Sequence, residues 1–200
     1  MTPISRRHFL TTLCAVALVG LTPLRAAALN ADSAAQLVGR VVNDINGVIN
    51  SGKSESQMIQ EFARIFVRYS DVATIARSSL GPDARRASAA QMKSYTQAFT
   101  GYMARKYGKR FREFIGGRID VKSTRAVKSF FEVKTLAVLK GEAPFEVIFL
   151  VSNKSGKDLF FDMLIEGISL LKSERTEIGA MIDRQGGDLD AMIRDLAKAG

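Results

Sequence analysis

The sequence predicts an α+β domain in which several helices pack on a curved antiparallel sheet of about four strands. Two observations support this prediction. Apolar residues recur every three or four positions through the first half of the chain, which is typical of amphipathic helices. After Gly116-Gly117 the spacing changes to alternation over short segments that are separated by turn sequences, which is typical of hairpin strands.

The first three helices are expected over residues 32–49, 54–66 and 71–75. The first carries an apolar stripe at helical spacing and stops at Asn50-Ser51-Gly52. The second opens on a capping-box pattern at residues 54–57, and Asp71 is placed to cap the third before Gly81-Pro82 ends it.

A long helical run follows over residues 88–115, with aromatic and methionine residues along one face. Gly101 and Gly108 weaken it, because glycine is a poor helix former, and we expect a kink or break at these positions.

Four strands are expected over residues 118–124, 130–139, 145–152 and 159–166. On each of the last three strands one alternating set is apolar or small, while the opposite set is mixed, so helices should cover at least one face of the sheet. The apolar sets are Val133, Thr135, Ala137 and Leu139; Val147, Phe149 and Val151; and Phe161, Met163 and Ile165. Helices over residues 169–183 and 188–198 complete the prediction.

The N-terminal segment predicts export. The run Ser-Arg-Arg-His-Phe-Leu at residues 5–10 resembles a bacterial twin-arginine signal, and the apolar stretch 9–24 is too short for a stable membrane span. Ala26-Ala27-Ala28 supplies small residues for cleavage. We therefore expect a cleaved signal peptide over residues 1–28 and one domain over 29–200 in the periplasm, with an N-terminal membrane anchor as the alternative.

Composition argues against an enzyme. The only histidine and the only cysteine, His8 and Cys14, lie in the predicted signal, and tryptophan is absent. Residues 29–200 therefore cannot form a disulfide, a Cys or His zinc site, a cysteine nucleophile or a Ser-His-Asp triad. Carboxylates that could act as acid and base remain, but Lys172 and Arg175 are close enough in sequence to pair with them; they are Asp162, Glu166, Glu174 and Glu177. We expect neither a metal nor a cofactor.

The charge predicts acidic partners. Three of the 29 basic residues and no acidic residue lie in 1–28, so 26 basic residues remain against 20 acidic ones. Export disfavours nucleic acid as the partner. One basic cluster could dock anionic headgroups or an acidic protein, or could be an ordinary solvated helix face; it consists of Arg105, Lys106, Lys109, Arg110 and Arg112.

Five segments resemble the MlaC family, the toluene-tolerance type auxiliary component of ABC transport systems. They are 75–81 (Ile-Ala-Arg-x-x-Leu-Gly), 107–111 (Tyr-Gly-Lys-Arg-Phe), 162–171 (Asp-Met-x-Ile-Glu-Gly-Ile-Ser-Leu-Leu), 174–179 (Glu-Arg-x-Glu-Ile-Gly) and 186–189 (Gly-Gly-Asp-Leu). The resemblance covers nearly all of residues 29–200, although Arg85 and Asp158 stand where the family often has tryptophan.

The resemblance implies a periplasmic phospholipid carrier that maintains outer-membrane asymmetry. Its partners would be an inner-membrane ABC transporter complex and an outer-membrane lipoprotein, with transient contacts near the membranes. A cavity between helices and sheet would hold the lipid tails. By resemblance and position, the expected lining residues are Phe99, Met103, Tyr107, Phe111, Phe114, Val133, Thr135, Ala137, Val147, Phe149, Phe161 and Met163.

The residues alone leave alternatives open. The aromatic face of the long helix could be ordinary packed core, in which case the protein would be a ligand-free accessory subunit of the transporter. The cavity could also carry another lipid, such as a hopanoid.

Overall fold

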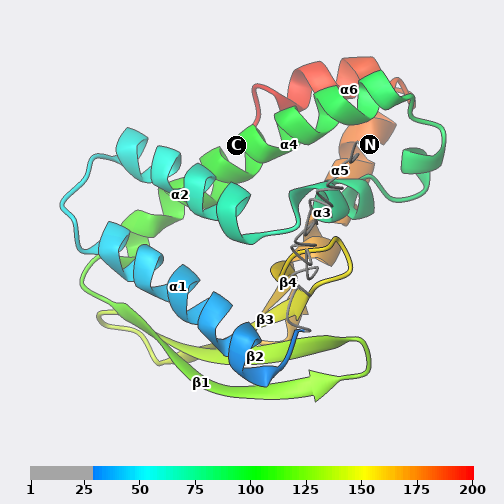
Figure 1. The fold of residues 1–200 in the computed structure, drawn as a ribbon. Helices are drawn as coiled ribbons and strands as arrows, with labels where there is room; N and C mark the ends of the chain where they lie inside the picture. The colour runs from blue at the N-terminus through cyan, green and yellow to red at the C-terminus, as the bar shows by residue number, and fades with distance from the viewer. Residues whose placement is uncertain (1–28) are drawn as a thin grey trace, which may run out of the picture.

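The computed structural model describes residues 29–200, which form six α-helices and a five-stranded antiparallel sheet in the order β1-β2-β3-β4-β5 (Figure 1). The predicted α+β class is confirmed. The predicted signal peptide, residues 1–28, lies outside the described residues. Within 29–200 no helix is both long and apolar enough to cross a membrane.

The elements follow the predicted order. They are α1 (Ala31–Ile49), α2 (Glu55–Tyr69), α3 (Val72–Leu80), the 3-10 helix η1 (Gly81–Arg85), α4 (Ala89–Gly108), the 3-10 helix η2 (Lys109–Phe114), β1 (Arg118–Val127), β2 (Phe130–Val138), β3 (Phe145–Ser152), β4 (Leu159–Ile165), β5 (Ile168–Ser169), α5 (Leu170–Arg184) and α6 (Leu189–Leu196). The two-residue strand β5 was not predicted; it pairs with the end of β4.

The predicted helix caps form. The Ser54 hydroxyl accepts a hydrogen bond from the backbone N–H of Gln57, whose side chain accepts one from the Ser54 N–H at 2.9 Å. The Asp71 carboxylate accepts from the Thr74 N–H at 3.1 Å. Helix α3 is longer than the predicted residues 71–75, since it ends at Leu80, directly before Gly81-Pro82.

The predicted break in the long helix occurs at only one of the two glycines. Helix α4 runs through Gly101 without interruption and ends at Gly108, where the tighter η2 begins. Gly108 is required by packing, since a Cβ atom there would lie 2.7 Å from the Cα atom of Ile59 in α2. The two helix backbones therefore meet closely at this point, whereas Gly101 faces only the flexible end of Arg105.

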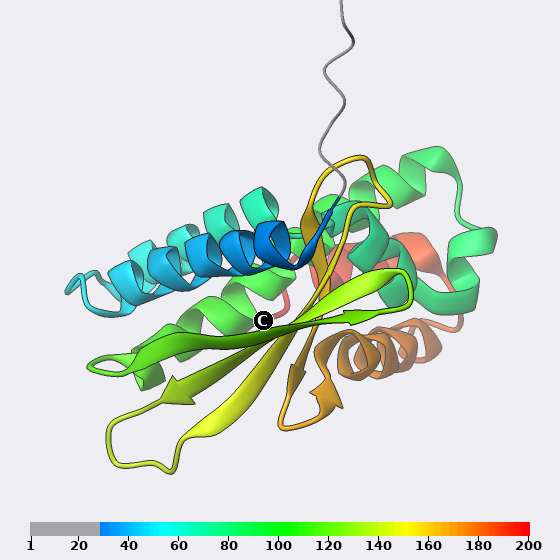
Figure 2. The same ribbon diagram turned by 60° about the horizontal axis from the view of Figure 1, so that its bottom comes forward.

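Helix α1 lies along one face of β1 and β2, and α2 and α4 lie beyond it on the same side (Figure 2). The predicted alternation of β2 and β3 is confirmed, since Val133, Thr135, Ala137, Val147 and Phe149 are all buried on the helix-covered face. The hydroxyl of Thr135 donates to the Val147 carbonyl at 2.8 Å, so this buried polar group is satisfied.

The alternation predicted for β4 is wrong for the residues before Asp162. Phe160 pairs with Val151 and Met163 pairs with Phe149, so the chain holds one residue more on β4 than on β3. This β-bulge places Phe160 in the buried core, and Phe161 does not share the face of Met163 as predicted. Phe161 instead makes an edge contact with the Phe130 ring, with centroids 5.6 Å apart.

We predict that Gly108→Ala destabilises residues 29–200 by about 2 kcal/mol, because the added methyl group overlaps the backbone of α2. Gly47→Ala is the matched control. Gly47 is exposed in α1, and nothing lies within 4 Å of the place that its new methyl group would take, so the same change should stabilise the protein by about 0.5–1 kcal/mol. Urea unfolding measures both, and equal effects would contradict the close α2–α4 approach.

Candidate functional site

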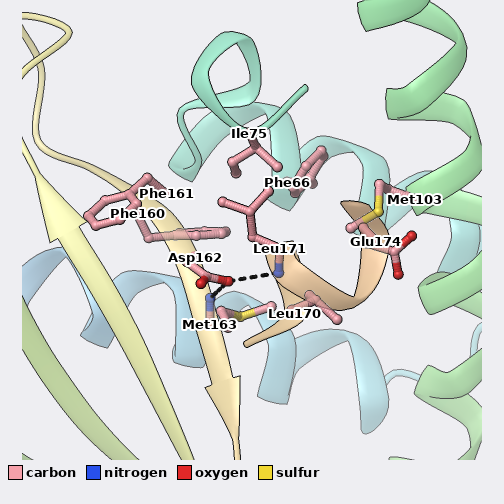
Figure 3. Close-up of a pocket in the computed structure, with 10 residues that line it drawn as sticks. All are labelled: Phe66, Ile75, Met103, Phe160, Phe161, Asp162, Met163, Leu170, Leu171 and Glu174. Atoms are coloured by element: carbon pink, nitrogen blue, oxygen red, sulfur yellow. Dashed lines mark hydrogen bonds between the residues drawn. The ribbon is translucent and has the colours of Figure 1, made fainter. Parts of the chain in front are cut away.

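An apolar pocket lies where β4, α5 and the ends of α2 and α3 meet, with one residue from α4 (Figure 3). It encloses about 280 Å³, counting its open mouth. In Figure 3 Leu171 of α5 faces Phe66 and Ile75, while Phe160 and Phe161 come from the strand on the other side. The lining residues are Phe66, Ile75, Met103, Phe160, Phe161, Asp162, Met163, Leu170, Leu171 and Glu174.

Eight of these ten residues are apolar, so the pocket suits an apolar group. The part of it that a water-sized sphere can enter is only about 20 Å³, far below the roughly 300–1,000 Å³ that is usual for small-molecule sites. A ligand larger than a water molecule therefore enters only when the walls move apart.

The wall between β4 and α5 is fixed by Asp162. Its Oδ1 atom accepts from the backbone N–H groups of Met163 and Leu171, at 2.7 and 2.9 Å, and its Oδ2 atom accepts from the Ser169 hydroxyl at 2.6 Å. Figure 3 shows the two backbone bonds. With both oxygens occupied, Asp162 serves to hold the first turn of α5 against the strand.

Glu174 lines the inner side of the pocket, and its side chain is only 1% exposed. Its Oε1 atom accepts from the Lys106 ammonium at 2.8 Å and from the Tyr107 hydroxyl, both on α4. Lys106 also donates to Glu177 and, at 2.8 Å, to the Tyr102 hydroxyl. This cluster joins α4 to α5.

The cluster corrects a predicted pairing. Lys172 and Arg175 were expected to pair with these carboxylates because they are near in sequence. Both Glu174 and Glu177 pair instead with Lys106, which lies 68 residues from Glu174. Helices that are distant in sequence meet here, and no spacing pattern in the sequence indicates this contact.

The electrostatics of the cluster follow from burial and pairing. Burial disfavours the charge on Lys106, but hydrogen bonds to Glu174 and Glu177 outweigh it and raise the pKa of the lysine. Burial likewise disfavours the charge on Glu177, yet Lys106 and the Tyr102 hydroxyl outweigh it and lower its pKa. Both shifts favour the ion pair at neutral pH. Among residues 29–200 no three His, Cys, Asp or Glu side chains gather closely enough to hold a metal ion.

The residues predicted to contact lipid divide into two sets. Met103, Phe161 and Met163 line the pocket. The other nine lie outside it. On the sheet, Val133, Thr135, Ala137, Val147 and Phe149 are buried on the face that α1 covers. On the helical side, Phe99 and Phe111 are buried, while Tyr107 and Phe114 pack partly buried against the same core.

Several lining residues were missed, although signals for most existed. Ile75, Leu170 and Leu171 lie within the segments that resemble the MlaC family, and Phe66 is on the predicted apolar face of its helix. Phe160 was missed because the bulge is not visible in the alternation pattern.

Each residue of the predicted basic cluster binds a carboxylate or a carbonyl of the protein. Arg105 donates to the carbonyls of Leu196 and Ala199, at 3.0 and 2.7 Å, at the C-terminal end of α6. The remaining contacts are Lys106 with Glu174 and Glu177, Lys109 with the Gly200 carbonyl, Arg110 with Glu113, and Arg112 with Glu55. The cluster is therefore partly structural.

A second hollow borders the first turns of α5 and is half polar. The hydroxyls of Ser173 and Thr176 there donate to the carbonyls of Ser169 and Lys172, at 3.1 and 3.2 Å. Its mixed lining shields an apolar group less well than the first pocket does.

Comparisons with known proteins agree with the fold. A family model described as MlaC protein matches residues 39–198. A solved phospholipid-binding protein from Ralstonia solanacearum, in complex with a phospholipid, superposes with a TM-score of 0.71 at 18% identity. The match covers 82% of this chain and 95% of that chain. A search of curated proteins gives no match.

We predict that Asp162→Ala costs about 3 kcal/mol of stability, because three donors lose a charged acceptor. The control is Glu142→Ala, an exposed loop carboxylate, whose effect should stay below about 0.5 kcal/mol. Urea unfolding compares the two. An Asp162→Ala protein as stable as the control would show that these bonds do not hold α5 in place.

Alkaline pH provides another test. Burial raises the pKa of all four tyrosines above the ordinary 10.0. A nearby carboxylate adds to this effect, which is Asp44 for Tyr69 and Glu174 for Tyr95, Tyr102 and Tyr107. The unfolded chain loses these phenol protons first, so the free energy of unfolding should fall as pH rises past 10.0. Lys106, whose pKa is raised, contributes in the same direction.

Phenolate absorbance should therefore appear together with the loss of the helical circular dichroism signal, in one transition above pH 10.0. The chain has no tryptophan to obscure it. Phenolate that forms near pH 10.0 in a protein that is still helical would contradict the buried positions of these side chains.

Proposed function

Because the chain belongs to the MlaC family, we propose that it is a periplasmic carrier that binds phospholipid through its acyl tails and shuttles it between the outer membrane and an inner-membrane ABC transporter. The family and the phospholipid-bound structural neighbour indicate a binding or transport protein rather than an enzyme. The observation that carries the proposal is the apolar pocket between β4 and α5.

The energetics explain why such a carrier needs a pocket. Each CH₂ group left in water costs about 0.8 kcal/mol, so a tail of about sixteen carbons forfeits on the order of 10 kcal/mol in crossing unprotected. A protein that only shields the tails needs no reacting groups and no cofactor. The pocket lining fits this task, because it is apolar apart from Asp162 and Glu174. Both of these carboxylates accept hydrogen bonds from groups of the protein.

In this proposal the tail first contacts Met103, Phe161 and Met163, which line the existing pocket. As the pocket widens, the tail reaches further predicted residues that now pack in the neighbouring core, such as Phe99 and Phe149. The headgroup remains in solvent near the pocket mouth.

Docking to the transporter or to an outer-membrane lipoprotein is assigned to the exposed part of the basic cluster. Arg110 and Arg112 are about 60% exposed, and their ion pairs lie on the surface, where such pairs contribute little and can exchange for another anion. Arg105 and Lys106 are less suited, since they bind groups inside the protein.

One observation favours a second candidate function. The pocket is small, and the aromatic face of α4 is tightly packed, with Tyr95 and Phe99 fully buried. A ligand-free accessory subunit of the transporter would have such a core.

Native mass spectrometry separates the two functions. Residues 29–200, purified from the periplasm without detergent, should carry an added mass that fragments as a phospholipid. A protein that is free of lipid, and that stays so after incubation with phosphatidylethanolamine and phosphatidylglycerol vesicles, would establish the accessory-subunit function instead.

A tryptophan reporter locates the tails. Because the chain contains no tryptophan, Phe161→Trp introduces a single tryptophan at the pocket wall, and its emission should shift to shorter wavelength when phospholipid is added. Val67→Trp is the control, since Val67 is 57% exposed on α2 and lies outside the pocket. A shift in both variants, or in neither while lipid binds, would place the tails elsewhere.

A further inference from the structure

The walls of the pocket differ in how they are joined. Helices α2 and α4 meet closely, through the contact of Gly108 with the Ile59 backbone and through the stacked rings of Phe62 and Tyr107. Helices α4 and α5 have few close backbone approaches and are joined by long side chains. Side-chain contacts can be broken while each helix stays intact, so the α4–α5 side is the one that can separate.

The buried part of the contact that joins them, here called the α4–α5 contact, consists of Lys106 and Tyr107 on α4 and Glu174 on α5. Figure 3 shows the Glu174 carboxylate turned toward α4, beside Met103 of the pocket lining. Both donors bind the same oxygen, Oε1, while Oε2 is buried and has no hydrogen-bond partner within residues 29–200. Half of this carboxylate is thus unsatisfied in the closed arrangement.

The unsatisfied oxygen lowers the free energy needed to separate the two helices. A buried ion pair gains attraction but loses the hydration of both charges, and the two terms nearly cancel. When the helices separate, Glu174 regains water at both oxygens, and Lys106, already 28% exposed, regains its hydration. An apolar contact of equal size would recover nothing from water on opening.

We propose that the α4–α5 contact holds the empty pocket closed, and that α5 moves away from α4 to admit a phospholipid tail. This inference rests on the proposed function and assigns Lys106, Tyr107 and Glu174 to control of tail uptake rather than to contact with the lipid. Asp162 of β4 keeps the first turn of α5 fastened to the sheet, so the movement concerns the part of the helix beyond that turn.

Distances between paired spin labels test the movement directly. Residues 29–200 contain no cysteine, so Gln97→Cys on α4 with Thr176→Cys on α5, both exposed positions, labels the protein only there. Addition of phosphatidylglycerol should lengthen this distance by more than about 2 Å, the size that distinguishes rearrangement from side-chain adjustment. Gln97→Cys with Gln60→Cys on the closely packed α2 is the control, and its distance should not change.

The variant Glu174→Gln tests the contact itself. It removes the charge but keeps a group that can accept from Tyr107, and Lys106 retains Glu177. Uptake of a fluorescent phospholipid from vesicles should become about tenfold faster, as expected for loss of one charged hydrogen bond from the closed state. Glu61→Gln is the matched control; Glu61 pairs with Lys53 at 2.6 Å away from the pocket, and uptake should keep its wild-type rate.

The outcomes separate this inference from the proposed function. Lipid that binds with no change in the α4–α5 distance, or Glu174→Gln with a wild-type uptake rate, overturns the inference and leaves the carrier function standing. A wild-type protein that takes up no phospholipid overturns both. A lengthened α4–α5 distance with faster uptake in Glu174→Gln alone supports the inference.

Discussion

The three hydrogen bonds accepted by Asp162 determine where the pocket can exist. The sheet ends at the two-residue strand β5, which pairs with the end of β4 and leads directly into α5, so the first turn of α5 must be fastened to this edge of the sheet. A single carboxylate does this by accepting from β4, from β5 and from the helix. Leu171 is held facing Phe66 of α2 and Ile75 of α3 as a result, and the pocket is the space that these elements leave (Figure 3).

Two of the basic side chains make contacts inside this molecule. Arg105 binds carbonyls at the end of α6, and Lys106 neutralises Glu174 between two helices. A basic composition that suggests an external anionic partner therefore serves partly to make internal contacts between elements far apart in sequence. The excess of positive charge over the whole surface still favours acidic partners, because internal pairing with carbonyls leaves the net charge unchanged.

Most of the fold could be predicted from local patterns, and the parts that could not depend on tertiary contacts. Caps such as Ser54 and alternation such as Val133 to Ala137 are determined within a few residues, and both are confirmed. The uninterrupted passage of α4 through Gly101 depends on what lies beside the helix, and the burial of Phe160 depends on pairing with β3. The pocket was only partly predictable for the same reason, since five elements contribute to it. The partner of Glu174 lies on a helix 68 residues away, so no sequence spacing indicates it.

The bulge at Phe161 has a consequence for how this strand can evolve. The two halves of β4 are out of phase, with Phe160 and Met163 facing the same side although three positions separate them. In a regular strand the loss or gain of one residue reverses the faces of everything beyond it. In this chain Phe161 is the extra residue of the bulge. A related chain that lacked it would still pair Asp162 and Met163 with the same residues of β3. Length variation in β4 among relatives would therefore be tolerated at this one position, beside the pocket, and would change the shape of the pocket without disturbing the sheet.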